Sequence, residues 1–179
     1  MAISKAWWMK KPKPEPLDRA RLRQAVIDLL SRRDYSRLEL QRKLQPKAAD
    51  ADDLTAVLDD MAERRWQSDE RFTDAFLHSR SDRYGPLRLT QELQQKGIAD
   101  ARTAVAALDT DWQERAAQLA LRKFSGADLT DIKQKARIYR HLAQRGFNAD
   151  HIRYALEQLA AAGDPHGSLS DDEISPGWD

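Results

Sequence analysis

The sequence predicts an all-α protein made of three tandem three-helix repeats that form an elongated, curved arc of unspecified hand. Apolar residues recur 49 positions apart, at Leu44, Leu93 and Leu142 and at Leu40, Leu89 and Ile138. A fixed period of this length is typical of stacked helical units. Alanine and leucine dominate the middle of the chain and valine occurs only three times, which favours helix over strand. No segment keeps the alternation of a half-buried strand.

The first repeat is expected over residues 18–67. Its first helix starts near Asp18. Ser36 and Glu39 form a capping box that opens the second helix, and Pro46 ends that helix because proline cannot continue it. The third helix is marked by an apolar stripe at Leu54, Val57, Leu58 and Met61.

The second repeat is expected over residues 68–109. Ser68 caps its first helix, and Pro86 suits the first position of the next helix because its missing N–H has no partner there. Gly97 ends that helix, since glycine tolerates the left-handed conformation. A short third helix is expected over 101–108.

The third repeat is expected over residues 110–163. Thr110 and Gln113 fit a capping box before its first helix. The second helix is expected over about 128–144, closed by Gly146, and Asn148 caps the last one. Nine helices are therefore expected in all.

The two ends of the chain differ in charge from the middle. Residues 1–17 are basic and proline-containing, residues 164–179 are acidic, and both are expected to be disordered because neither can bury a core. Net charge is +7 over 1–50, −4 over 51–110, +3 over 111–163 and −5 over 164–179. Such alternation suggests separate contact patches rather than one basic groove.

Little in the sequence points to catalysis. There is no cysteine, no glycine-rich phosphate loop and no histidine pair with metal-site spacing, so we expect no enzymatic activity, no cofactor and no metal. Asp52, Asp59 and Asp60 could share a helix face and hold magnesium in a nuclease, but an ordinary solvated face is favoured. No apolar run approaches a membrane span, and a cytoplasmic location is expected.

Basic clusters recur in each repeat and are the candidate binding residues, because such clusters contact phosphates or acidic protein surfaces. Lys133, Arg137 and Arg140 are spaced so that they lie on the helix face away from Ile138 and Leu142. The full set of candidates is Arg32, Arg33, Arg42, Lys43, Arg80, Arg83, Arg88, Lys96, Arg122, Lys123, Lys133, Lys135, Arg137 and Arg140.

Three motifs stand out over residues 20–160. The central one begins Ser68-Asp69-Glu70-Arg71-Phe72 and runs through Tyr84-Gly85-Pro86 to Gly97-Ile98. The opening one contains Arg32-Arg33-Asp34-Tyr35-Ser36 and the closing one is Arg145-Gly146-Phe147. Together they resemble the motifs of the RecX family. The chain departs from the family at Arg65-Trp66-Gln67. It departs again in the third repeat, where Lys133-Gln134 stands in place of a tyrosine followed by glycine or serine.

The resemblance implies a monomeric, non-enzymatic regulator of the recombinase RecA. Such a protein would lie in the groove of the RecA–DNA filament and impede filament extension, ATP hydrolysis and strand exchange. Weak, sequence-independent binding to single- or double-stranded DNA is expected beside it. An autonomous DNA-binding regulator remains open as an alternative, since three-helix units include helix-turn-helix readers.

Overall fold

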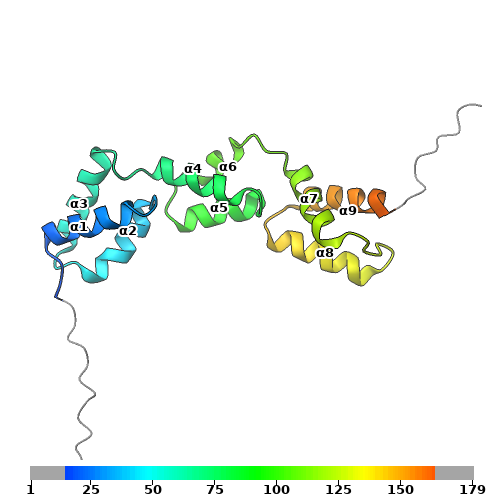
Figure 1. Cartoon of the computed structure of the whole chain (residues 1–179), viewed down its shortest axis with the longest axis horizontal. Coiled ribbons are helices and arrows are strands. Elements are labelled where there is room, and N and C mark those ends of the chain that lie inside the picture. The colour runs from blue at the N-terminus through cyan, green and yellow to red at the C-terminus, as the bar shows by residue number, and fades with distance from the viewer. Residues whose placement is uncertain (1–14, 164–179) are drawn as a thin grey trace, which may run out of the picture. The chain divides into compact units, whose positions relative to one another are not determined.

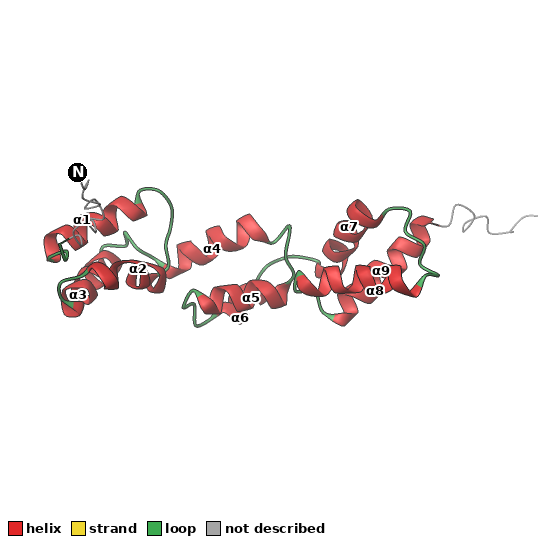
Figure 2. Ribbon diagram, turned by 90° about the horizontal axis from the view of Figure 1, so that it is seen from below, coloured by secondary structure: helices red, strands yellow, loops and turns green. Residues whose placement is uncertain are grey.

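The structure is a computed structural model that describes residues 15–163, and these residues form helices without any strand (Figures 1 and 2). The helices are α1 (Arg19–Leu30), α2 (Arg37–Leu44), α3 (Ala51–Glu63), α4 (Asp69–Arg80), α5 (Pro86–Gln95), α6 (Ala101–Ala106), α7 (Trp112–Phe124), α8 (Ile132–Gln144) and α9 (Ala149–Gly163). This confirms the all-α prediction. The expectations for residues 1–14 and 164–179 fall outside the described part.

The chain divides into two compact units, with the boundary inside α4 between Phe72 and Thr73. The first unit contains α1–α3, and the second contains α5–α9 with most of α4.

Helices α1–α3 enclose one apolar core, as the sequence pattern predicts. Its buried members are Leu22, Val26, Leu40, Leu44, Leu54, Val57, Leu58 and Met61. Asp18 caps α1, and its carboxylate accepts from the Arg21 N–H at 2.9 Å. The capping box is confirmed: Ser36 Oγ accepts from the Glu39 N–H at 3.1 Å, and Glu39 accepts from the Ser36 N–H at 3.4 Å.

The structural match between the repeats, 49 residues apart, is poorer at the end of α2. Pro46 lies in a 3-10 turn over Gln45–Lys47, whereas the other two repeats have a glycine of positive φ at the corresponding end. In the second and third repeats the residue after this glycine is buried (Ile98 and Phe147), whereas the corresponding Ala49 of the first repeat is exposed. Leu17 lies beside this turn instead: its N–H donates to the Lys47 carbonyl at 2.7 Å, and its carbonyl accepts from Ala49.

The second repeat has the predicted helix ends. The Arg71 N–H donates to Ser68 Oγ at 3.1 Å before α4. Pro86 is the first residue of α5, and Gly97 follows its C-cap with φ 86°. Leu89 and Leu93 are fully buried. Helix α6 ends at Ala106, two residues before the predicted end.

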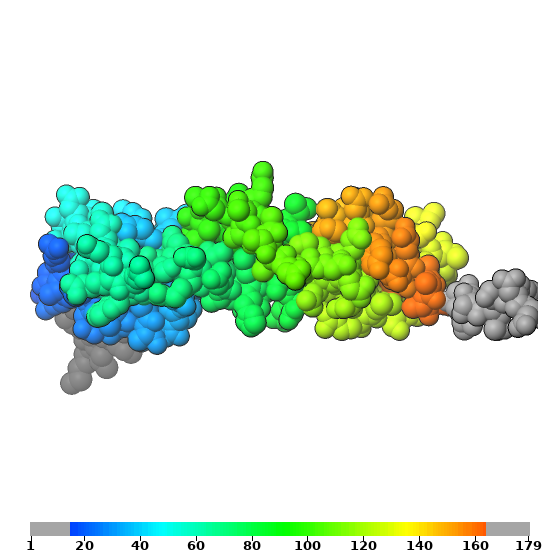
Figure 3. Space-filling model, turned by 90° about the horizontal axis from the view of Figure 1, so that it is seen from above, coloured from blue at the N-terminus to red at the C-terminus, as the bar shows by residue number. Residues whose placement is uncertain are grey.

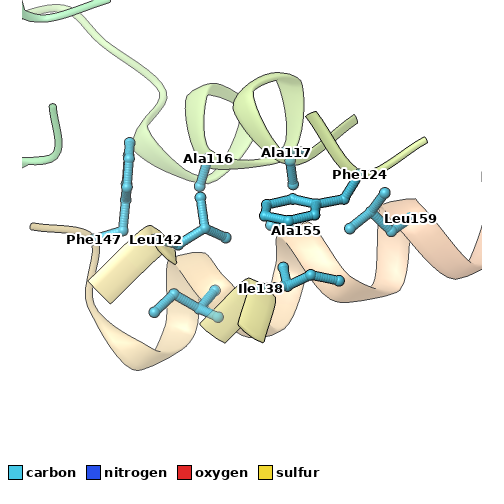
Figure 4. Packing of buried hydrophobic residues seen from close by; sticks show 10 residues of the cluster. Ala116, Ala117, Phe124, Ile138, Leu142, Phe147, Ala155 and Leu159 are labelled. Atoms are coloured by element: carbon cyan, nitrogen blue, oxygen red, sulfur yellow. The ribbon is translucent and has the colours of Figure 1, made fainter. Parts of the chain in front are cut away.

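The third repeat packs α7 and α9 along each other, with α8 closing one side. Small side chains of α7 allow this close approach. Figure 4 shows Phe124, Leu142 and Phe147 gathered beside Ala116 and Ala117 of α7. Gly146 has the predicted left-handed φ of 88°, and Asn148 Oδ1 accepts from the His151 N–H at 2.9 Å as predicted.

Two predicted helix starts in this repeat are wrong. The cap of α7 is Asp111 rather than Thr110, because the Asp111 carboxylate accepts from both Gln113 N–H and Glu114 N–H at 3.0 Å. Helix α8 starts at Ile132 rather than near 128. Asp128 accepts from the backbone and hydroxyl of Thr130, which makes a local turn that competes with the helix.

Within the second unit, the turn before α5 contacts the turn after α8 mainly through backbone hydrogen bonds, and the Arg145 guanidinium also donates to the Arg83 carbonyl at 2.9 Å. The Gly85 N–H donates to the Arg145 carbonyl at 2.7 Å, and the Leu87 N–H donates to the Gly146 carbonyl at 3.1 Å. A Cβ on Gly85 would lie 2.5 Å from the Gly146 oxygen, and one on Gly146 would lie 2.4 Å from Arg88. Only glycine fits at both positions, so this contact fixes α8 relative to α5.

Candidate binding surface

Arg33, one of the candidate cations, is used within the first unit. Its guanidinium donates to Glu39 at 3.0 Å and lies 3.5 Å from the centre of the Tyr35 ring. Arg42 also takes part in an interaction within the chain. Arg32 and Lys43 are exposed. This repeat therefore keeps only part of its predicted cluster available to a partner.

The cluster of the second repeat is organised around Glu92. Arg80 donates to this carboxylate at 2.7 Å and Arg88 at 2.8 Å. The Arg88 guanidinium lies 4.1 Å from the centre of the Tyr84 ring and also donates to the Gln144 carbonyl at 3.2 Å. Arg80 and Arg88 therefore hold this part of the fold together, and Tyr84 packs beneath them. Lys96 also takes part in an interaction within the chain. The side chain of Arg83 is exposed.

The cations of α8 are arranged differently. Lys133, Arg137 and Arg140 are all exposed and follow one another at helical spacing. None of the three forms an ion pair with any residue in 15–163, and Arg140 donates only to a carbonyl of its own helix, that of Ala136 at 3.2 Å. We call these three residues the α8 basic stripe.

The end of α7 adds positive charge beside this stripe. Burial lowers the pKa of His141, and the charges of Lys123, Arg145 and Arg137 lower it further. Lys123 of α7 and Arg137 of α8 therefore act on the same imidazole, which accepts a hydrogen bond from Arg145 Nε at 3.0 Å. Arg122 is also exposed, and its Nε donates to the Gln118 carbonyl of its own helix at 3.4 Å.

Lys135 does not belong to the stripe. It lies two residues from both Lys133 and Arg137, about 200° away around a helix of 3.6 residues per turn. The structure places it on the opposite flank, where it lines a groove between α8 and α9 of about 370 Å³. We call this the α8–α9 groove; the adjoining surfaces of the two helices appear in Figure 3. It is lined by Leu129, Lys135, Tyr139, Ala149, Ile152, Arg153, Leu156, Glu157 and Ala160.

This groove was not predicted from the sequence. The signal that could have found it is apolar surface on α8 outside the buried positions Ile138 and Leu142. Tyr139 is 46% exposed, and Ile132 at the start of the helix is 81% exposed. An apolar floor with cations on its rim can hold a segment that is both apolar and acidic.

Two of the three carboxylates considered for a magnesium site, Asp59 and Asp60, are bound to arginines instead. Asp59 accepts from Arg37 at 2.6 Å, and Asp60 pairs with Arg23 and Arg64 at 3.0 and 2.7 Å. The hydrogen bond from Arg64 lowers the pKa of Asp60. Over residues 15–163 no group of three histidine or carboxylate side chains is placed to hold a metal ion. In the same range no helix is long and apolar enough to cross a membrane.

Comparisons with known proteins identify related chains over most of this length. The family models described as "RecX, second three-helix domain" and "RecX, third three-helix domain" match residues 68–103 and 109–156. A protein named "Regulatory protein RecX" from Chromobacterium violaceum is 44% identical over 135 residues, which is 75% of this chain and 88% of the relative. A protein of the same name from Neisseria meningitidis is 41% identical over 136 residues, which is 76% of this chain and 89% of that relative.

A solved structure shares the fold. The crystal structure of RecX from Lactobacillus salivarius aligns with a TM-score of 0.66 at 20% identity, covering 80% of this chain and 97% of that one.

Proposed function

Because the chain belongs to the RecX family, we propose that it is a non-enzymatic regulator of the recombinase RecA. It binds in the groove of the RecA–DNA filament as a monomer, without a cofactor. There it inhibits filament extension, ATP hydrolysis and strand exchange. The family motifs of the sequence support this role, and a regulator of this kind acts in the cytoplasm.

The observation that carries the proposal is the α8 basic stripe. Lys133, Arg137 and Arg140 repel one another, and no acidic side chain of residues 15–163 forms an ion pair with them. Such an arrangement does not stabilise the fold, because like charges at this spacing destabilise a helix. Contact with DNA phosphates or with an acidic surface of RecA relieves the repulsion and attracts the partner over long range. The stripe is therefore the part of the molecule best suited to bind the filament.

Three repeats in one chain supply more than one contact. A second contact made by a tethered repeat is intramolecular, so individually weak contacts combine into strong binding. A regulator that touches neighbouring RecA subunits in one geometry opposes the changes that accompany nucleotide turnover. A small protein of this kind therefore needs few copies per filament to act.

The test is RecA's ATP hydrolysis on single-stranded DNA, with this protein titrated in below one molecule per RecA. We expect inhibition well below that ratio, because one bound regulator affects several subunits. Filaments must first be confirmed with RecA from the same source. Absence of any effect on such filaments would overturn the proposal.

The role of the stripe is tested by the triple variant K133Q/R137Q/R140Q. Glutamine keeps the helix propensity of α8 but removes three charges, so we expect inhibition to be largely lost. The matched control, R19Q/K47Q/R102Q, removes the same charge from three exposed positions outside the candidate set. Full inhibition by a triple variant with wild-type circular dichroism and thermal unfolding would refute the assignment.

A second candidate is a regulator that reads DNA on its own. The exposed cation Lys133 at the start of α8, the second helix of its repeat, favours it, since helix-turn-helix proteins read bases from such a helix. It predicts a sequence-specific footprint without RecA. Weak, salt-sensitive binding that is indifferent to sequence would exclude it.

A further inference from the structure

We propose that the acidic C-terminal segment of this chain, residues 164–179, docks in the α8–α9 groove and reduces the positive charge of the third repeat. The described residues end at Gly163, the last residue of α9. The segment therefore begins beside the helix that forms one wall of the groove.

The groove has the shape of a docking site for an extended segment. On α9 its lining residues recur on a single helix face, from Ala149 through Ile152 and Leu156 to Ala160. Tyr139 of α8 forms the opposite wall. Ile152 is only 1% exposed and forms an apolar floor, whereas Tyr139 is half-exposed and leaves apolar surface uncovered.

An acidic segment finds an available cation at this groove. Lys135 and Arg153 lie on its rim beside Glu157. Arg153 pairs with Asp150 at 3.0 Å, whereas Lys135 forms no ion pair with any residue in 15–163 and can receive an acid of the segment. Residues 164–179 have five acidic and no Lys or Arg side chains, and three of the acids are consecutive at 171–173. Apolar Ile174 follows them directly, and Trp178 comes four residues later. Acids can thus pair with the rim while Ile174 or Trp178 covers the floor.

The segment is long enough and is held close by the chain. The groove extends along α9 from residue 149 to 160, about 17 Å at 1.5 Å per residue. The acids at 171–173 follow Gly163 by eight to ten residues, a reach of up to about 30 Å. Tethering raises the effective concentration of the segment to the millimolar range, so a weak contact is sufficient.

Docking would change the net charge of the third repeat. Residues 111–163 carry +3 and residues 164–179 carry −5, so the two together carry −2. A docked segment therefore weakens the attraction of this repeat to a polyanion, and a partner must displace it to gain the full attraction. This consequence rests on the proposed function, whereas the docking itself does not.

Docking is tested on the full chain in the absence of RecA and DNA. The chain has no cysteine, so the substitution Ser170→Cys creates a single thiol for a nitroxide spin label. We expect amide signals of Tyr139, Ile152 and Leu156 to broaden strongly, and those of α2 and α3 to stay sharp. One molar salt should reduce the broadening, because it screens the ion pairs.

The matched control is the same labelled chain carrying D171N/D172N/E173Q. The tether and its length are unchanged, so proximity alone gives equal broadening in both chains, whereas docking gives at least a twofold loss in the control. Equal broadening would overturn the proposal. Comparable broadening in isotope-labelled chains that carry no spin label, when they are mixed with spin-labelled chains, would assign the groove to a second copy and overturn the proposal as well.

Because no partner is present, these outcomes are independent of the ATP hydrolysis test. A docked segment in a chain that does not inhibit RecA would refute the proposed function and keep the docking. An inhibitory chain with a free segment would do the reverse.

Discussion

In the first repeat, arginines are matched with acidic side chains, whereas in the third repeat the cations of α8 stand without them. Arg37 pairs with Asp59 at 2.6 Å, and Arg23 pairs with Asp60 at 3.0 Å. The cations of the α8 basic stripe form no such pair with residues 15–163. Both repeats consist of three α-helices, but in the third a row of surface cations on α8 is neutralised by no acidic side chain of the described residues.

The difference separates structural cations from those suited to bind a partner. An exposed ion pair contributes about 0–1 kcal/mol, but it also neutralises the arginine that a partner would need. Neighbouring cations without partners cost a few tenths of a kcal/mol through repulsion. A basic cluster in a sequence is thus a good candidate for binding only where its own fold does not neutralise it.

The largest expected effects come from matched core leucines. Leu44 and Leu142 occupy corresponding positions and are almost completely buried. Replacing either with alanine should destabilise its own unit by about 2–5 kcal/mol, from lost burial and an internal cavity. Hydrogen exchange measured in α1–α3 and in α7–α9 reports the two units separately. If Leu44→Ala lowers protection equally in both, the chain unfolds as one cooperative body and the comparison of separate units fails.

The next effect concerns the glycines that end helices or loops in the third repeat. Gly146→Ala should cost about 2–4 kcal/mol, because its Cβ would lie 2.4 Å from Arg88 and its φ is positive. Gly126→Ala is the matched control: its φ is 77°, but nothing lies within 4 Å of an added Cβ, so about 1 kcal/mol is expected. Urea unfolding measures both. Equal costs would show that strain rather than the contact with α5 makes Gly146 necessary.

The sequence predicts local features of this fold better than its tertiary contacts. Caps such as Ser36, Asn148 and Gly146 depend on a few neighbouring residues and were predicted correctly. The start of α8 was not, because Asp128 and Asp131 are both able to cap and the turn at Thr130 decides between them.

The candidate site shows the same division. The Arg88–Glu92 pair has the i, i+4 spacing of a helix, so the sequence contains its signal although the pair was not predicted. The Arg80–Glu92 pair requires α4 to pack beside α5. The position of Lys135 follows from helix geometry, but the groove it lines requires α9. Spacing therefore indicates which cations share a face, and only packing shows which of them are neutralised.

Acidification should distinguish the two units. Burial lowers the pKa values of His141 and His151, so the folded second unit binds fewer protons than the unfolded chain below the ordinary value of 6.5. The contribution of these two histidines to the stability of the unit is fully present above that pH and is lost as the pH falls further. Residues 15–72 contain no histidine, and the lowered pKa of Asp60 matters only near and below 3.8. Between pH 7 and 5, hydrogen-exchange protection, corrected for the slower intrinsic exchange at low pH, should therefore fall in α7–α9 and not in α1–α3.

The control for this effect is His141→Gln, which keeps an acceptor for Arg145 but cannot be protonated. The pH dependence of the second unit should become shallower in this variant. An unchanged dependence would assign the loss of stability to His151 or to other groups.

The smallest effect is the response to salt, and its sign should differ between the repeats. Raising salt from 0.1 to 1 M screens the exposed pairs of Arg37 with Asp59 and of Arg64 with Asp60, so α2 and α3 should lose a few tenths of a kcal/mol. The same salt relieves the repulsion between Lys133 and Arg137, so α8 should gain about 0.2–0.5 kcal/mol.

Any general effect of salt on apolar burial is common to both repeats, so the difference in hydrogen exchange between α3 and α8 is the quantity to measure. In K133Q/R137Q/R140Q the gain in α8 should vanish while the loss in α3 remains. A gain that persists in this variant would mean that the stripe carries no repulsion to relieve, and the distinction between neutralised and available cations would not hold.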